Sequence, residues 1–153
     1  MLEGSRKNGS FGHGFTYGGH PVACAVGVEA LKIYEERDIV SHVKRVSPVF
    51  LAALEKAREH PLVGDVRGVG LIAGVEVVAD KRTRAPFPAA LKAGLAVQKG
   101  CEDEGLIVRA IGDRIAFTPP LIITEGEAEE IGARLRRGLD RAMAALRPAL
   151  AAE

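Results

Sequence analysis

Apolar and polar positions divide this chain into helix and strand signals that follow a glycine-rich beginning. Residues 1–20 contain irregularly spaced glycines and no apolar period, so we expect an extended or mobile segment there. Pro21 then fits the first turn of a helix, because its missing N–H is not needed at that position. The helix predicted from Pro21 to Tyr34 is apolar around almost its whole circumference. Such helices are buried on more than one side, and in a chain this small the pattern indicates a surface for a partner.

Beyond Asp38, the spacing of apolar residues predicts two helices and two strands. Asp38 can cap a helix whose apolar residues recur every three or four positions as far as about His60. Two strand signals follow, then an exposed charged loop, then a helix that ends at Gly105 in the position of a C-cap. The strands are predicted over 63–67 and 70–78, with Gly68 and Val69 between them. The loop is predicted over 79–88 and the helix over 89–104.

The last part of the pattern is a hairpin followed by a capped helix. Strands over 106–111 and 114–118 are joined by Gly112 and Asp113, with glycine first as a type II′ turn requires. Thr124 and Glu127 form a capping box for the final helix. The apolar stripe of this helix is Ile131, Leu135, Leu139, Ala142 and Leu146. The order of elements predicts an α+β fold (an α/β sandwich) in which a small antiparallel sheet packs with about four helices, as one domain over 21–148.

Length, charge and cysteine usage narrow the class of protein. The chain has 153 residues, which fits one domain. A balance of 21 basic and 20 acidic residues gives no reason to expect binding to nucleic acid or to an anionic membrane surface. No apolar stretch approaches the roughly 18 residues that span a bilayer, and the polar N-terminus does not read as a signal peptide. Cys24 and Cys101 lie far apart without a metal-binding pattern, which suits a reducing compartment. We therefore expect a cytoplasmic protein with no nucleic-acid or membrane partner.

The glycine-rich loop before the first helix is one candidate site. Between Phe11 and Pro21, backbone N–H groups and the hydroxyl of Thr16 can be directed at an anion. A glycine-rich loop before a helix is a weak motif, however, and spacing alone favours a flexible linker. The four histidines have no metal-ligand spacing, and Cys24 is most simply a small core residue.

Arg109 is the second candidate. It shares one strand face with Ile107 and Ile111, although a guanidinium needs an anionic or hydrogen-bonding partner. The two-pronged donor geometry of arginine matches a carboxylate, so Arg109 could clamp a substrate carboxylate. Residue chemistry alone slightly favours the alternatives, an internal ion pair with Glu76 or Asp113, or a solvated residue on an edge strand.

Four segments, in this order, resemble the C-terminal part of a class-III pyridoxal-phosphate-dependent aminotransferase. They are Gly14-Phe15-Thr16-Tyr17 followed by Gly19-His20-Pro21-Val22-Ala23-Cys24-Ala25, then Val66-Arg67-Gly68-Val69-Gly70-Leu71, then Gly105-Leu106-Ile107-Val108-Arg109-Ala110-Ile111-Gly112-Asp113, and finally Pro119-Pro120-Leu121-Ile122-Ile123-Thr124. The resemblance runs from about Phe11 to Leu146. It is nearest to the omega-transaminase branch, whose members act on beta-alanine, putrescine and other amines with pyruvate as acceptor. It implies the small C-terminal domain of a fold-type I pyridoxal-phosphate (PLP) transferase.

The resemblance also implies roles for individual residues. Thr16 corresponds to the threonine that binds the cofactor phosphate in the active site of the neighbouring subunit, with Gly14 and Phe15 beside it. Arg109 corresponds to the mobile arginine that grips a substrate or acceptor carboxylate and swings out for an uncharged amine. The resemblance further implies PLP as cofactor, an amine and a 2-oxo acid as small-molecule substrates, and a homodimer or a large-domain partner.

The family's Schiff-base lysine has no counterpart among the lysines of this chain. In the family that lysine belongs to a large domain, which would precede Met1. The lysines here lie on the N-terminal segment, the small-domain helices and the charged loop, at positions 7, 32, 44, 56, 81, 92 and 99. We therefore expect no catalytic residue in this chain and no transaminase activity from it alone.

Two other hypotheses remain open from the sequence. One is a non-catalytic dimerisation or regulatory domain derived from such an enzyme, because the apolar helix from Pro21 to Tyr34 would be difficult for a lone domain to cover. The other is a simple phosphate or carboxylate binder that uses the loop from Gly14 to Pro21.

Overall fold

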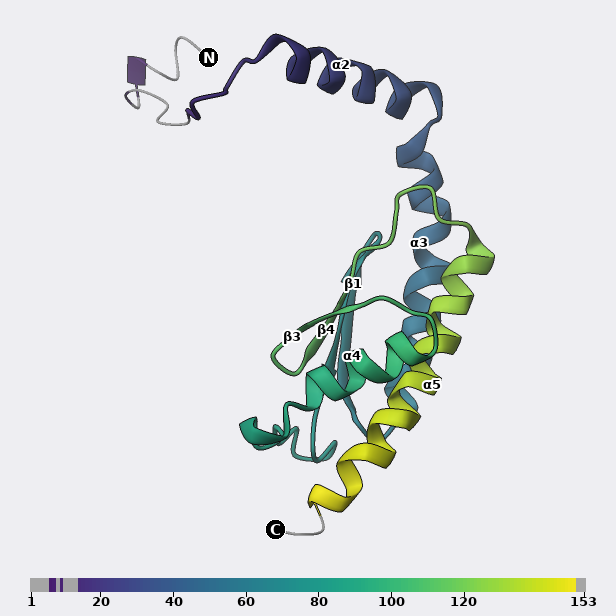
Figure 1. Ribbon diagram of the computed structural model, residues 1–153. Coiled ribbons are helices and arrows are strands. Elements are labelled where there is room, and N and C mark those ends of the chain that lie inside the picture. The colour runs from purple at the N-terminus through teal and green to yellow at the C-terminus, as the bar shows by residue number, and fades with distance from the viewer. Residues whose placement is uncertain (1–5, 8, 10–13, 151–153) are drawn as a thin grey trace. The chain divides into compact units, whose positions relative to one another are not determined.

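A computed structural model describes residues 6, 7, 9 and 14–150, with side chains as far as Arg147. These residues belong to two compact units, divided between Asp38 and Ile39. The first contains α2 (Pro21–Glu36). The second contains α3 (Ile39–Glu55), β1 (Val63–Val69), β2 (Ile72–Val77), α4 (Ala93–Asp103), β3 (Arg109–Ile111), β4 (Arg114–Phe117) and α5 (Glu125–Leu150), together with the short 3-10 helices η1 (Lys56–Glu59) and η2 (Ala89–Leu91) (Figure 1). The predicted α+β fold, a small antiparallel sheet with four α-helices in the described residues, is confirmed.

The sheet of the second unit has four antiparallel strands in the order β1-β2-β4-β3. Helices α3, α4 and α5 lie on one side of it (Figure 1). Along β2, Ala73, Val75 and Val77 are buried, whereas Ile72 is exposed and Glu76 is partly exposed. This period of two is typical of a sheet that has one covered and one uncovered face.

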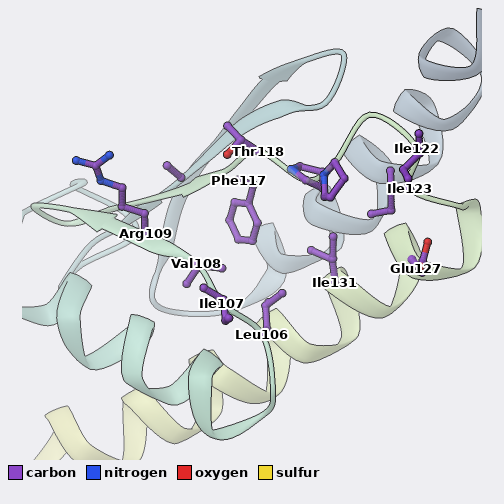
Figure 2. Close-up of a pocket in the computed structure, with 13 residues that line it drawn as sticks. Leu106, Ile107, Val108, Arg109, Phe117, Thr118, Ile122, Ile123, Glu127 and Ile131 are labelled. Carbon is purple, nitrogen blue, oxygen red and sulfur yellow. The ribbon is translucent and has the colours of Figure 1, made fainter. Parts of the chain in front are cut away.

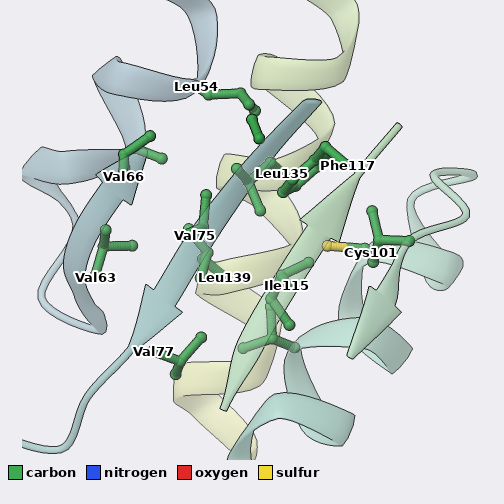
Figure 3. Packing of buried hydrophobic residues seen from close by; sticks show 14 of the residues in the cluster. Leu54, Val63, Val66, Val75, Val77, Cys101, Ile115, Phe117, Leu135 and Leu139 are labelled. Carbon is green, nitrogen blue, oxygen red and sulfur yellow. The ribbon is translucent and has the colours of Figure 1, made fainter. Parts of the chain in front are cut away.

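The core lies between that covered face and the helices, and it is mainly aliphatic, with Phe50, Phe87 and Phe117 as its aromatic members. Figure 3 shows Val75 and Ile115 from the sheet directed toward Leu135 and Leu139 of α5, and all four are fully buried. The apolar stripe predicted for the last helix is confirmed, since four of its five residues are buried and Ile131 packs against the cluster.

Local signals located several element ends correctly. Gly112 has a φ of 58° in the two-residue turn between β3 and β4, and Gly105 has a φ of 73° after α4. Both values lie in the left-handed region that favours glycine. In the capping box, Thr124 N donates to Glu127 Oε2 at 2.8 Å and Glu127 N donates to Thr124 Oγ1 at 3.3 Å. The hairpin turn, the C-cap and the capping box are therefore as predicted.

Other predicted boundaries were wrong by a few residues. The first hairpin turns at Gly70, whose φ is 58°, so β1 runs to Val69 and includes the predicted separator. The third long helix starts at Ala93 rather than residue 89, because Lys92 has a left-handed φ of 48° that interrupts the helix. The second edge strand starts at Arg109 rather than residue 106, since only three residues pair with β4.

The first unit contains the predicted apolar helix, α2, but none of its residues is buried. Val22, Val26 and Leu31 are each more than 60% exposed. Cys24 is exposed as well, so the interpretation of this cysteine as a core residue was wrong for the described chain. The predicted extended or mobile segment 1–20 includes residues 1–5, 8 and 10–13, which lie outside the described residues, and it stays a prediction.

Candidate functional site

The candidate cofactor residues Gly14, Phe15 and Thr16 lead into the turn that precedes α2. Gly18 N donates to Phe15 O at 2.8 Å, and His20 N donates to Tyr17 O at 3.1 Å. Phe11, Gly12 and His13 of the same motif lie outside the described residues.

The beginning of α2 has the character of an anion-binding helix end. Pro21 occupies the first turn, and His20, at the N-cap position, makes no side-chain capping bond. The first turn contains no acidic residue, and the hydroxyl-bearing Thr16 is exposed. Backbone N–H groups at such an end, together with the helix dipole, favour a negatively charged group.

Arg109 lies in the second unit, on β3 at the edge of the sheet. It pairs with Ala116 of β4, and Ala116 in turn pairs with Gly74 of β2. Residues opposite one another in an antiparallel sheet project from the same face, so two small residues lie beside Arg109 on that face. The arginine is exposed, and small neighbours leave room around its side chain.

The structure excludes one of the interpretations left open by the sequence. Glu76 lies 3.9 Å from Arg114 Nε, and Asp113 Oδ1 accepts a hydrogen bond from Gly94 N at 3.0 Å. Within residues 14–147, no carboxylate forms an ion pair with Arg109. The proposed internal pair with Glu76 or Asp113 was therefore wrong. A carboxylate clamp and a solvated edge residue remain.

An open groove of about 660 Å³ runs beside Arg109 (Figure 2). Its walls are mainly apolar and come from the segments on either side of β3 and β4 and from the start of α5. The lining includes Leu106, Ile107, Val108, Phe117, Ile122 and Ile131. Figure 2 shows the Arg109 guanidinium directed away from these apolar side chains. The arrangement is thus a cation at the rim of an apolar groove.

The polar groups at the far end of the groove form hydrogen bonds that stabilise the fold. Glu127 forms the capping box with Thr124, and the N–H and hydroxyl of Thr124 lower the pKa of the Glu127 carboxyl. His42 Nε2 lies 2.8 Å from the carbonyl oxygen of Ile123, which ties α3 to the same loop. These contacts fix the wall of the groove.

A second charged cluster surrounds Asp65, which is only 8% exposed. Arg58 Nη1 donates to Asp65 Oδ1 at 2.9 Å, and Arg67 Nε donates to Oδ2 at 2.6 Å. These two guanidinium groups hold the pKa of Asp65 at about 2. Arg58 Nη2 also donates to Val66 O at 2.8 Å, so the cluster joins η1 to the edge of β1 and has a structural role.

The described part of the chain offers little other chemistry. It contains no group of three or more metal-ligating side chains and no helix long and apolar enough to cross a membrane. Several lysines are engaged at the surface: Lys32 pairs with Glu29 at 3.2 Å, and Lys99 with Asp103 at 2.5 Å. Sequence reasoning missed Gln98, which accepts a hydrogen bond from the backbone of β3. Its partner lies on another element, and no local pattern points to it.

Comparison with known proteins assigns most of the chain to one family. The model of the family described as aminotransferase class-III matches residues 4–139. Gamma-aminobutyrate transaminase 1, mitochondrial, from Oryza sativa subsp. indica is 51% identical over 127 residues, which are 83% of this chain and 25% of that protein. The Solanum lycopersicum protein named gamma aminobutyrate transaminase 1, mitochondrial, is 44% identical over 83% of this chain and 25% of its own length.

Solved structures give the same result. The omega transaminase from Pseudomonas jessenii in complex with PMP is 42% identical to this chain, with a TM-score of 0.82 over 96% of this chain and 32% of that one. A structure described as a transaminase with L-ala has a TM-score of 0.83 at 42% identity, over 95% of this chain and 34% of that one. The chain therefore spans about a quarter of the length of the curated relatives and a third of these solved chains.

Proposed function

Because the chain belongs to the class-III aminotransferase family, we propose that it provides the small domain of an omega-transaminase-like enzyme that moves an amino group from an amine or omega-amino acid to a 2-oxo acid. Arg109 would bind the carboxylate of the substrate or acceptor. The observation that carries this proposal is an exposed guanidinium at the rim of an apolar groove, with no ion-pairing carboxylate in the described chain.

The family implies PLP in the intact enzyme, and the described residues fit its phosphate. The N-terminus of α2 lacks a side-chain cap and an acidic first turn, and Thr16 adds an exposed hydroxyl. We infer that Thr16, Phe15 and Gly14 contact the phosphate, in an active site completed by a neighbouring subunit. When bound, PLP supplies the electron sink that transamination requires. The chain's own contribution is to orient the phosphate through backbone N–H groups and a hydroxyl.

Arg109 can discriminate between substrates by charge. A bidentate guanidinium–carboxylate pair is a charge-assisted interaction, and a net contribution of about 1.5–3 kcal/mol is typical. That range corresponds to roughly 10- to 150-fold in affinity. An amine or aldehyde that lacks a carboxylate would gain nothing from Arg109. Since the side chain has free space beside Ala116 and Gly74, it can turn toward solvent when such a substrate occupies the site.

We also propose that the 153 residues do not catalyse transamination by themselves. No lysine in the sequence matches the family's Schiff-base motif, and Lys32 and Lys99 have acidic partners on exposed helix faces. An activated lysine nucleophile instead requires burial or a neighbouring cation to lower its pKa. With PLP and borohydride, mass spectrometry should find only scattered labelling of exposed lysines in the isolated chain, with no single lysine labelled preferentially.

The test is a segment replacement in the omega transaminase from Pseudomonas jessenii, of which this chain covers 32%. The replaced enzyme, loaded with PLP, should transfer an amino group to pyruvate. In it, Arg109→Ala should raise the KM for pyruvate at least 10-fold and leave the KM for an uncharged aldehyde acceptor within twofold. Arg109→Lys should restore only part of the loss, because an ammonium group lacks the planar fork.

Arg114 provides the matched control. It is an exposed arginine on the adjacent strand, with its side chain 76% exposed, but it already faces Glu76 at 3.9 Å. Arg114→Ala should leave both KM values unchanged. Equal effects of the two alanine substitutions, or a folded and PLP-loaded enzyme without turnover, would contradict the proposed function.

A specific observation favours a second candidate, a non-catalytic dimerisation or regulatory domain. The apolar side chains of α2, Val22, Val26 and Leu31 among them, are exposed, and a large exposed apolar patch is typical of an interaction surface. Under this hypothesis the isolated chain forms a concentration-dependent dimer that Val26→Glu/Leu31→Glu abolishes. Under the leading proposal the same helix contacts a large-domain partner, and turnover requires that partner. Sedimentation that finds a compact monomer of the wild-type chain would exclude the second candidate.

Cytoplasmic location remains a proposal. It is supported by two cysteines that form no disulfide, as expected in a reducing compartment, whereas the plant relatives above are named as mitochondrial. Fractionation of the source cells, with antibody detection of this chain, tests it directly.

A further inference from the structure

We propose that Gln98 is a positioning residue for Arg109: its side chain, extending from α4, holds the edge strand that carries the arginine. The inference rests on the proposed carboxylate-binding role of Arg109. It adds a residue that neither the sequence pattern nor the family likeness singled out. It also predicts an effect on substrate selectivity from a residue that touches no substrate.

The contact is between a side-chain amide and the backbone of β3. Gln98 Oε1 accepts a hydrogen bond from Ala110 N at 2.9 Å. Ala110 is the middle residue of the three that form β3, and Arg109 is its immediate neighbour. In an antiparallel pair, alternate residues direct their N–H groups away from the partner strand. Gln98 therefore takes up a donor that an edge strand would otherwise leave to water.

Gln98 is itself held in place. Its Nε2 donates to Glu102 Oε1 at 3.0 Å, one turn further along α4. The side chain is half-buried, and the neighbouring residue Val97 is fully buried in the core. The side-chain amide oxygen of Gln98 is therefore held in position by a well-packed helix.

A second contact fixes the other end of the hairpin against the same helix. Asp113, in the turn between β3 and β4, accepts from Gly94 N at 3.0 Å, and Val77 N donates to the Asp113 carbonyl at 2.8 Å. A Cβ on Gly94 would overlap the carbonyl group of Gly112. Helix α4 therefore contacts the hairpin both at its turn, through Gly94, and at the middle of its edge strand, through Gln98.

This arrangement matters because β3 is short and lies at the edge. Only three residue pairs join it to β4, and strands of this kind open locally at low free-energy cost. Local opening of β3 would move the backbone that carries the Arg109 side chain relative to any carboxylate held by the rest of the enzyme. Even a displacement of about 1 Å has large effects on a positioned group. Gln98 restricts that movement and leaves the guanidinium itself free to turn.

Two variants and one rescue test the inference. Gln98→Ala removes the acceptor. Gln98→Glu/Glu102→Gln keeps an acceptor oxygen for Ala110 and exchanges the roles within the side-chain pair, so that no like charges face each other. Glu102→Gln alone keeps Gln98 intact and is the matched control.

The first readout uses the 153-residue chain and is independent of catalysis. Amide exchange followed by NMR should show the Ala110 N–H exchanging about fivefold faster or more in Gln98→Ala, which corresponds to the loss of a hydrogen bond worth about 1 kcal/mol. Exchange at Val75 and Ile115, in the centre of the sheet, should stay within twofold of wild type. Glu102→Gln and the double variant should both protect Ala110.

The second readout uses the PLP-loaded segment-replacement enzyme. Gln98→Ala should raise the KM for pyruvate 3- to 10-fold with kcat within twofold and with no change for an uncharged aldehyde, and the double variant should restore the wild-type KM. If exchange at Ala110 increases but the KM for pyruvate does not, the positioning role is overturned. If Arg109→Ala itself leaves that KM unchanged, the proposed function has failed instead, and the two failures are thereby distinguished.

Discussion

Helices α4 and α5 cross where Gly138 faces Cys101, and their backbones approach closely enough there that an added methyl group would overlap α4. A Cβ at position 138 would lie 2.7 Å from Cys101 Sγ, 2.8 Å from Cys101 N and 2.9 Å from Cys101 Cα. Ordinary van der Waals contacts of a Cβ begin at 3.4 Å. Two of the three atoms belong to the α4 backbone, so a change of rotamer cannot relieve the overlap. Gly138→Ala therefore requires α4 and α5 to move apart.

Two opposing terms determine the expected stability change. Inserting a methyl group into a packed interface costs about 1–3 kcal/mol, because the fully buried Cys101 and Val97 must shift with α4. Replacing glycine by alanine in a helix interior returns about 1 kcal/mol. The difference is about 0–2 kcal/mol. We expect the upper half of that range, a net loss of about 1–2 kcal/mol in the free energy of unfolding, because two of the three overlapping atoms belong to the backbone. With a urea m-value of about 2 kcal/mol/M, the midpoint should fall by roughly 0.5–1 M.

Circular dichroism at 222 nm during urea titration is the appropriate assay. The chain has no tryptophan, and its two tyrosines, Tyr17 and Tyr34, lie in the first unit, so fluorescence would not report on the second. Gly126→Ala is the control, since a Cβ there meets no atom within 4 Å, and it should leave the midpoint unchanged or raise it. A Gly138→Ala midpoint at or above that of wild type, with an unchanged m-value, would show that the helix crossing accommodates the added methyl group and would contradict this prediction.

Three further predictions concern the fold of the second unit. The pKa of Asp65 is about 2 in the folded chain, against 3.8 in the unfolded chain. Its contribution to stability is therefore present above about pH 4 and is lost as the pH falls from 4 to 2. In an acid titration followed by circular dichroism, Asp65→Asn should lack this loss of stability between pH 4 and 2. Thr124→Ala should cost about 1 kcal/mol through loss of the helix cap, and Thr124→Ser should restore most of it in the same urea assay. Burial raises the pKa of Cys101 to about 12, so a thiol reagent at pH 8 should modify Cys24 alone in the native chain and both cysteines in urea.

The order and type of the elements could be predicted because their signals are local. A Gly-Asp turn, a Thr-x-x-Glu capping box and an apolar stripe each lie within a few residues of the structure that they specify. The ends of the elements were harder to predict from the sequence. The helix start at Ala93 depends on Lys92 adopting a left-handed φ of 48°, a conformation that its residue type disfavours. That residue closes η2 just before Gly94 meets the hairpin turn, so the boundary is set by tertiary contact.

The candidate site likewise has a part that could be predicted from the sequence and a part that depends on tertiary contacts. Arg109 could be singled out from its own strand and from the family likeness, but the identity of its neighbours could not. Whether Glu76 or Asp113 neutralises it depends on Arg114 and Gly94, which approach those carboxylates from other parts of the chain. The same applies to Gln98, whose partner, Ala110, lies 12 residues away on another element. Residue chemistry along a strand can identify a group able to bind an anion. Whether that group is free to bind one depends on contacts with distant residues.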